Sequence, residues 1–176
     1  MTAAYNFERY LNVRSAYGPS FSPDGRRLAF LTDITGVAEV WSVPVDIRAE
    51  LPAWPAQLTF RSERVAGISY SPTEDVMLLT ADVGGNELTQ LYVLSGEGAT
   101  FTTLTDQPEV IHTSAQWSPD GKRIAYSSNE RDRRYFDIYE RTIETGNVKR
   151  ILTQDGTNHI MRYSPDGQQV LFGRYE

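Results

Sequence analysis

The stretch Trp117-Ser118-Pro119-Asp120-Gly121 decides the fold of this chain. Close copies stand at Phe21-Ser22-Pro23-Asp24-Gly25 and Tyr163-Ser164-Pro165-Asp166-Gly167, and a divergent copy is Tyr70-Ser71-Pro72-Thr73-Glu74. Proline presets φ for a type I turn, serine can hydrogen-bond to the backbone, and glycine tolerates the left-handed conformation that starts the next strand. We therefore predict tight structural turns at the three complete copies and a looser connection at the divergent one.

The turns recur at a nearly constant spacing. Their serines, Ser22, Ser71, Ser118 and Ser164, are 49, 47 and 46 residues apart. The runs beside them, such as Arg123-Ile124-Ala125-Tyr126, are rich in residues that suit a pleated sheet. A period in the forties with β-type flanks indicates the blades of a β-propeller. We predict an all-β chain, a partial β-propeller of four-stranded antiparallel blades with three full blades and half of a fourth.

The period also divides the chain. We expect an N-terminal segment over 1–15 with a short helix from about Asn6 to Arg14, then blades over 16–60, 61–106 and 107–154, and the first half of a fourth blade over 155–176. The outer strands should end alike, in Gln57-Leu58-Thr59, Thr103-Leu104-Thr105 and Ile151-Leu152-Thr153. The expected strands are 16–22, 26–33, 38–45 and 56–60, then 65–70, 75–81, 88–94 and 100–104, then 113–117, 122–128, 136–143 and 148–152.

Three and a half blades do not close a ring, because each blade buries its face against the next and a propeller has roughly four to eight blades. We expect the chain to be a fragment, or an assembly that a partner chain completes. The open blade faces should also favour self-association.

Composition excludes several classes of protein. The 176 residues are 40% hydrophobic and 11% aromatic, which suits one domain with a packed core. The net charge of −6, without a large basic cluster, argues against a nucleic-acid partner. The absence of cysteine removes disulfides and thiol nucleophiles. With no secretory signal or membrane-length apolar run, we expect a cytoplasmic protein without a membrane partner.

The residues do not form a catalytic pattern. A hydrolase elbow requires Gly-x-Ser-x-Gly, and the nearest string, Gly18-Pro19-Ser20-Phe21-Ser22, lacks the second glycine. The two histidines, His112 and His159, both precede an inner strand and are better explained as structural residues hydrogen-bonded to a neighbouring blade. We predict no catalytic residue, no metal site and no cofactor in this chain.

Two charged segments are candidates for binding. The run Asn129-Glu130-Arg131-Asp132-Arg133-Arg134-Tyr135 is expected to be a loop between the second and third strands of its blade, most simply a solvated and self-paired one. Arg131, Arg133 and Arg134 are its candidates for a role facing substrate or another domain. Glu87 is the candidate in the corresponding segment of the second blade, Asp82-Val83-Gly84-Gly85-Asn86-Glu87, which offers too few oxygens for calcium.

The blades resemble the propeller of prolyl oligopeptidase-type serine peptidases, especially the acylaminoacyl-peptidase and dipeptidyl-peptidase-like bacterial members. The resemblance rests on the third blade from Trp117 to Thr153, on Gly84-Gly85-Asn86-Glu87-Leu88-Thr89-Gln90-Leu91-Tyr92, and on the opening Arg9-Tyr10-Leu11-Asn12-Val13-Arg14-Ser15-Ala16. It implies a non-catalytic domain that caps an α/β-hydrolase domain with a Ser, Asp and His triad and gates the entry of short peptides.

The resemblance implies that the chemistry lies in a hydrolase domain that this chain lacks. None of the triad residues can be assigned here, so the parent protein would be a serine peptidase although the chain itself would not be an enzyme. The turn motif also occurs in the periplasmic propeller of the Tol system. The alternative is therefore a Tol-like module for protein–protein interaction.

Overall fold

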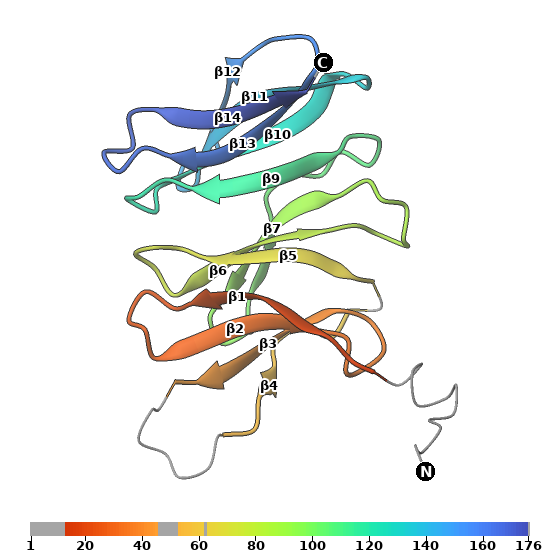
Figure 1. The fold of residues 1–176 in the computed structure, drawn as a ribbon, viewed down its shortest axis with the longest axis vertical. Coiled ribbons are helices and arrows are strands. Elements are labelled where there is room, and N and C mark those ends of the chain that lie inside the picture. Colours follow the sequence, from red (N-terminus) through yellow and green to blue (C-terminus); the bar gives the residue numbers. More distant parts are fainter. Residues whose placement is uncertain (1–12, 46–52, 62, 176) are drawn as a thin grey trace, which may run out of the picture.

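The computed structural model describes residues 13–45, 53–61 and 63–175 and shows a stack of antiparallel sheets (Figure 1). The predicted helix from Asn6 to Arg14 lies almost wholly outside the described residues. No helix in the described part of the chain is long and apolar enough to cross a membrane. The strands are β1 (Ala16–Phe21), β2 (Arg27–Thr32), β3 (Glu39–Pro44), β4 (Ala56–Gln57), β5 (Val65–Tyr70), β6 (Val76–Ala81), β7 (Gln90–Ser95), β8 (Phe101–Thr103), β9 (His112–Trp117), β10 (Arg123–Asp132), β11 (Tyr135–Thr142), β12 (Val148–Leu152), β13 (Thr157–Tyr163) and β14 (Val170–Tyr175).

Each repeat folds into a meander, in which neighbouring strands in the chain are neighbours in the sheet. Strands β1 to β4 form one four-stranded sheet and β5 to β8 form a second. Strands β9 to β12 follow the same order, and the β13–β14 hairpin joins them through a parallel bridge between Phe136 and Thr157. The prediction of a partial all-β propeller is confirmed. Below, the three sheets are called blades 1, 2 and 3, and the β13–β14 hairpin is called the half-blade.

The blades pack face to face through apolar side chains. Between blades 1 and 2, Leu31 and Val40 meet Met77 and Leu79 in one buried cluster. A second cluster joins blades 2 and 3, and a third joins blade 3 to the half-blade. Burying a side chain such as Leu79 contributes about 2 kcal/mol. The continuous stacking therefore supplies the core that no single blade could supply.

Equivalent strands pair in the same register in blades 2 and 3. Leu79 lies opposite Tyr92 in blade 2, and Tyr126 lies opposite Tyr139 in blade 3, with the first residue of each pair eight positions after its turn serine. This correspondence lets positions be compared from blade to blade without reference to another protein.

The charged run of blade 3 differs from the expected loop. Strand β10 continues to Asp132, which pairs with Tyr135 in β11, so the connection is a tight hairpin with Arg133 and Arg134 at its tip. The loop prediction is wrong for Asn129 to Asp132. Of these residues, Asp132 alone has a partner in the β11 ladder, and Asn129 to Arg131 lie in the irregularity between Ser128 and Asp132, after which the ladder resumes.

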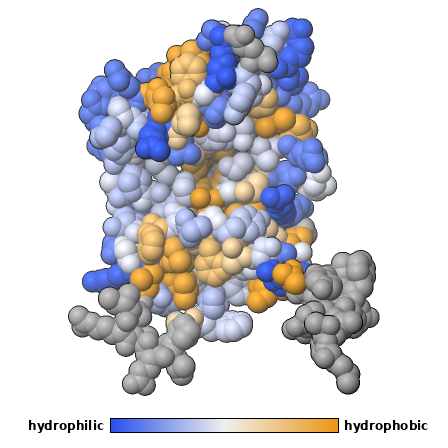
Figure 2. All heavy atoms as spheres, in the orientation of Figure 1, coloured by the Kyte–Doolittle hydropathy of each residue, from blue (hydrophilic) through white to orange (hydrophobic). Residues whose placement is uncertain are grey.

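The ends of the stack expose apolar groups. Met161 and Leu171 of the half-blade are 50% and 55% exposed, and Phe21 at the other end is 59% exposed. Figure 2 shows hydrophobic patches toward both ends of the long axis.

Candidate functional site

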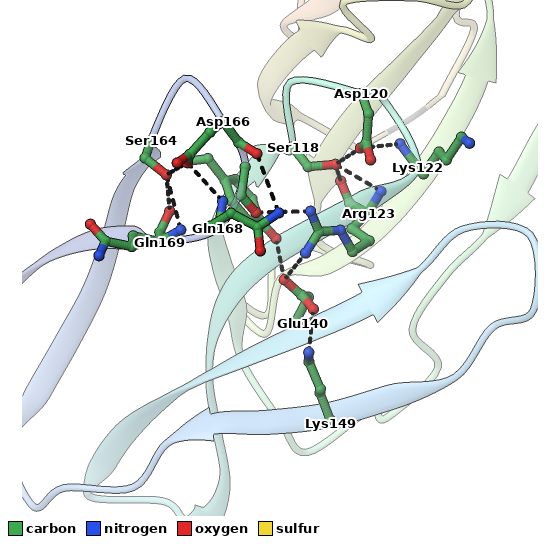
Figure 3. A network of polar contacts seen from close by, with 12 residues as sticks. Ser118, Asp120, Lys122, Arg123, Glu140, Lys149, Ser164, Asp166, Gln168 and Gln169 are labelled. Carbon is green, nitrogen blue, oxygen red and sulfur yellow. Dashed lines mark hydrogen bonds and ion pairs between the residues drawn. The ribbon is translucent and has the colours of Figure 1, made fainter.

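The Ser-Pro-Asp-Gly turns form the same hydrogen-bond pattern in three places. In blade 3, Ser118 Oγ donates to Asp120 at 2.6 Å and accepts from the Arg123 amide at 2.9 Å, and the Gly121 amide donates to the Ser118 carbonyl at 2.9 Å (Figure 3). Pro119 lies between serine and aspartate. The same bonds occur in the turn of Ser22, Pro23, Asp24 and Gly25 and in that of Ser164, Pro165, Asp166 and Gly167.

The serine and aspartate side chains of these turns are hydrogen-bonded within the turn itself. Bonds from the serine hydroxyl and from a backbone amide lower the pKa of Asp24, Asp120 and Asp166. Because each hydroxyl donates to a carboxylate fixed within the turn, the serines are held as turn donors and not directed at a ligand.

An arginine of blade 3 contacts the turn of the half-blade. Arg123 Nη2 donates to the Gly167 carbonyl at 2.9 Å, and Nη1 pairs with Glu140 at 3.2 Å. Lys149 and the Tyr163 hydroxyl also contact Glu140, at 2.8 and 2.9 Å (Figure 3). Burial raises the Glu140 pKa, but the bonds from Lys149 and Tyr163 and the charge of Arg123 outweigh it, so the pKa of Glu140 is lowered.

At the opposite end of the blades, the three candidate arginines have unequal roles. Arg131 forms a bidentate pair with the fully buried Asp137, at 2.6 and 3.0 Å, and also contacts Asp155 at 3.0 Å. Arg134 pairs with Asp132 at 2.7 Å within the hairpin. Arg133 is half exposed, and its nearest carboxylate, Glu109, lies 3.8 Å away. Arg133 is therefore the least engaged of the three.

Glu87 lies at the same end of the molecule, in the connection between β6 and β7. Its backbone is left-handed, with φ of 61°, and its amide donates to Asp82 at 3.0 Å. Its side chain is exposed. Glu87 thus presents a carboxylate from a fixed backbone, while Arg133 presents a guanidinium from blade 3.

The two histidines do not meet. His112 lies six residues before Ser118, and the residue six before Ser164 is Asn158, so His159 is displaced by one position and projects from the other face of its strand. The His159 ring stacks on Tyr175 with centroids 5.2 Å apart. Both ring nitrogens of His112 are buried without a hydrogen-bond partner among the described residues. The expected hydrogen bond from its ring to a neighbouring blade is therefore not present in that part of the chain.

Sequence reasoning missed a cleft on the inner edge of the stack. Strand β1 packs against β5, and β9 packs against β13, whereas β5 and β9 diverge. The resulting cleft has a volume of about 370 Å³. Its polar lining consists of neutral hydroxyl and amide groups from Ser69, Thr80, Thr89, Thr113, Ser114 and Gln116.

The chemistry of this cleft suits an extended polypeptide. Neutral hydroxyls and amides can both donate to and accept from a peptide backbone. Ser114 has a φ of 52°, an unusual conformation for a residue other than glycine, at the bulge of β9. The sequence signal for the cleft was the small polar character of the inner strands, which apolar periodicity alone does not reveal.

Buried polar residues lie at or near the start of the third strand of each blade and were also missed. They are Glu39, Gln90 and Asp137, each paired with the residue ten positions after its turn serine. Gln90 accepts a bond from the Gln107 amide at 3.1 Å and donates to the Val110 carbonyl at 2.8 Å. These residues fix the connections that lead from one blade to the next.

The chain is similar to several known proteins. No protein-family model matches the chain. Dipeptidyl aminopeptidase BIII of Pseudoxanthomonas mexicana is 32% identical over 151 residues, which cover 85% of this chain and 21% of that protein. The resemblance to prolyl oligopeptidase-type propellers is confirmed. A second homologue, the uncharacterized peptidase YuxL of Bacillus subtilis, is 28% identical over 91% of this chain and 29% of its own length.

Three further known proteins are similar to this prolyl oligopeptidase-type propeller. The Tol-Pal system protein TolB of Alcanivorax borkumensis is 31% identical over 61% of the chain and 24% of its own length. The crystal structure of TolB from Acinetobacter baumannii superposes with a TM-score of 0.68 at 22% identity, over 90% of this chain and 37% of that one. An acylaminoacyl peptidase structure gives a TM-score of 0.58 at 16% identity, over 90% of this chain and 28% of that one. The chain thus spans between about a fifth and somewhat over a third of the length of these proteins.

Proposed function

We propose that this chain is the non-catalytic propeller portion of a prolyl oligopeptidase-type serine peptidase, which gates the access of peptide substrate and packs on an α/β-hydrolase domain. The homology to dipeptidyl aminopeptidase BIII over 85% of the chain carries the proposal. The turn serines support it, since their hydroxyls are committed to the turn aspartates. Peptidase activity, peptide substrate, the hydrolase partner and a cytoplasmic location all belong to the proposed parent protein.

The inner cleft supplies a route by which the chain would contact peptide. Thr113 and Gln116 line it from blade 3 and Ser69 lines it from blade 2, without a formal charge that would select one peptide sequence. Neutral hydrogen bonding to the backbone is the recognition expected of a domain that admits short peptides of many sequences.

The proposal is tested in two parts. The purified chain is incubated with dipeptidyl p-nitroanilides and a fluorophosphonate probe, and neither hydrolysis nor labelling is expected. A short unstructured peptide is then titrated into the isotope-labelled chain, and the amide resonances of Thr113 and Gln116 should shift. Thr113→Val with Gln116→Leu should weaken binding, whereas the control Thr102→Val, on the exposed β8, should not. Serine labelling would overturn the non-catalytic role, and unchanged cleft resonances would overturn peptide gating.

The similarity to TolB supports a second candidate, a module for protein–protein interaction. It rests on the 31% identity over 61% of the chain. Under this alternative the cleft would not bind short peptides, whereas the intact chain would bind a folded protein. The peptide titration therefore distinguishes the two candidates.

A further inference from the structure

A second crevice, between the outer parts of blades 2 and 3, has an unusual polar lining. It has a volume of about 280 Å³ and lies away from the inner cleft, since its walls include Leu104 and Gln107 after β8 and Val148 at the start of β12. His112, Tyr126 and Arg141 form its inner wall.

Three side chains of this crevice hold buried polar atoms without a partner among the described residues. They are Gln107 Oε1, both ring nitrogens of His112, and Arg141 Nε. His112 is 1% exposed, so its ring is almost wholly shielded from bulk solvent and meets only what enters the crevice. Buried donors and acceptors are normally satisfied, because an unsatisfied group loses its hydration without compensation. A cluster of them on one crevice is the expected lining of a site whose ligand completes the bonds.

The same crevice between blades 1 and 2 provides an internal comparison. It is similar in size, about 230 Å³. The register places Val65 where blade 3 has His112, Leu79 where it has Tyr126, and Leu94 where it has Arg141. Blade 2 therefore shows that the fold accepts apolar residues at these three positions, so it does not require the polar groups of blade 3.

The charged groups of the blade 2–blade 3 crevice have both signs. Arg141 has no ion-pair partner among the described residues, although its side chain is half-buried. Glu130 and Asp106 supply carboxylates on the same crevice, and one oxygen of Glu130 accepts a bond from Gln107 Nε2 at 3.2 Å. Burial lowers the pKa of His112 to about 4, so its ring is neutral at pH 7 and offers one donor and one acceptor.

We propose that this crevice binds a small zwitterion, a free α-amino acid, whose carboxylate pairs with Arg141 and whose ammonium group faces Glu130 and Asp106. A simple anion would meet two carboxylates, and a simple cation would meet Arg141, whereas a zwitterion complements both. The volume equals that of about nine liquid waters, which accommodates an amino acid of similar heavy-atom count. The site is separate from the inner cleft, so it stands whether or not the proposed peptide gating holds.

The test is a nuclear magnetic resonance titration of the intact chain with L-leucine, and with acetate and methylamine as singly charged probes. Leucine should shift the amides of Gln107, His112 and Arg141 with a millimolar Kd, and acetate and methylamine should bind at least about tenfold more weakly. Arg141→Leu should weaken leucine binding about tenfold or more. The control Arg26→Leu, which removes an exposed arginine on blade 1, should leave it unchanged.

His112→Val is the second variant, and the blade 2 counterpart Val65 indicates that valine fits this register. It should weaken leucine binding several-fold while the chain melts at or above the wild-type temperature at pH 7. No shift with leucine would mean that the crevice holds only ordered water and would overturn the proposal. Equal binding of acetate, or unchanged binding by Arg141→Leu, would overturn the zwitterion assignment.

Discussion

Arg123 in β10 donates a hydrogen bond from Nη2 to the carbonyl oxygen of Gly167, 2.9 Å away in the turn of the half-blade. Blade 1 has an arginine at the same distance from its turn, Arg27, which donates to the Gly96 carbonyl at 3.1 Å and pairs with Asp75 of blade 2. Blade 2 has Val76 at this position. An arginine five residues after the turn serine therefore connects neighbouring blades at two of the three junctions.

Replacing Arg123 with methionine should destabilise the chain by about 1 to 3 kcal/mol, because Glu140 stays nearly buried and loses one of its charged partners. Lys149 and Tyr163 continue to contact Glu140 and limit the loss. Urea unfolding measures the difference. Arg26→Met, at an exposed position beside the first turn, is the control and should change stability by less than about 0.5 kcal/mol. An equal effect of both variants would show that Arg123 acts only through its general charge.

The turns and strand order were predictable because they depend on local chemistry. The bonds of Ser118 with Asp120 and Arg123 span no more than five residues, and the buried apolar run of β6 occupies consecutive positions. Sequence patterns capture such interactions, since the spacing of the residues fixes their geometry.

The candidate site was less predictable because strand pairing and packing between blades bring its partners together. Arg131 was identified as a candidate for binding, but the charge it meets belongs to Asp137, across the hairpin, and to Asp155. His112 was expected to be hydrogen-bonded, and its isolation depends on which side chains blade 2 places opposite it. Strand pairing within blade 3 and the connection to the half-blade decide the first outcome, and packing between blades 2 and 3 decides the second; no local sequence pattern shows either.

Alanine at Gly121 should destabilise the chain more than alanine at Gly25. Both glycines have φ near 70°, a conformation that costs other residues about 1 to 2 kcal/mol. At Gly25 an added Cβ meets nothing within 4 Å, whereas at Gly121 it would lie 2.1 Å from Thr73 Oγ1. Thr73 would have to turn away and lose its contact with the Asp120 carbonyl at 3.4 Å. Thermal melts of the two variants give the comparison, and the expected excess at Gly121 is about 1 kcal/mol.

His112 should make the chain less stable as the pH falls from about 6.5 to about 4. Burial lowers its folded-state pKa to about 4 from the ordinary 6.5, so in this window the unfolded chain binds more protons than the folded chain. Stability therefore rises with pH, and the full gain is present above the unfolded pKa. His112→Val should remove about 2 kcal/mol of this dependence. Urea midpoints at pH 4.5 and 7.5 measure it, and parallel pH profiles for wild type and variant would contradict the buried neutral ring.

The half-blade should promote self-association, because β14 is an edge strand among the described residues and Leu171 on it is 55% exposed. Leu171→Lys should shift sedimentation toward the monomer, since a charge on the edge disfavours pairing with another chain. Val148→Lys, which alters a residue 47% exposed on β12, is the matched control. Identical sedimentation of wild type and Leu171→Lys at tens of micromolar would exclude this edge as the contact.

The same substitution should destabilise the chain strongly at Arg131 and only slightly at Arg133. Among the described residues, Arg131→Met leaves the fully buried carboxylate of Asp137 with only the Arg150 guanidinium at 3.7 Å and the Gln154 amide at 3.3 Å. Removing one partner of a buried pair typically costs about 3 to 5 kcal/mol, and these remaining contacts place the expected loss near the lower figure. Arg133→Met should cost less than about 0.5 kcal/mol, since its side chain is half exposed and its carboxylate partner is 3.8 Å away. Urea unfolding of both variants separates the roles: a large loss at Arg133 would show that it supports the hairpin, whereas the expected result leaves Arg133 available to contact a ligand or a neighbouring domain at this end of the blades.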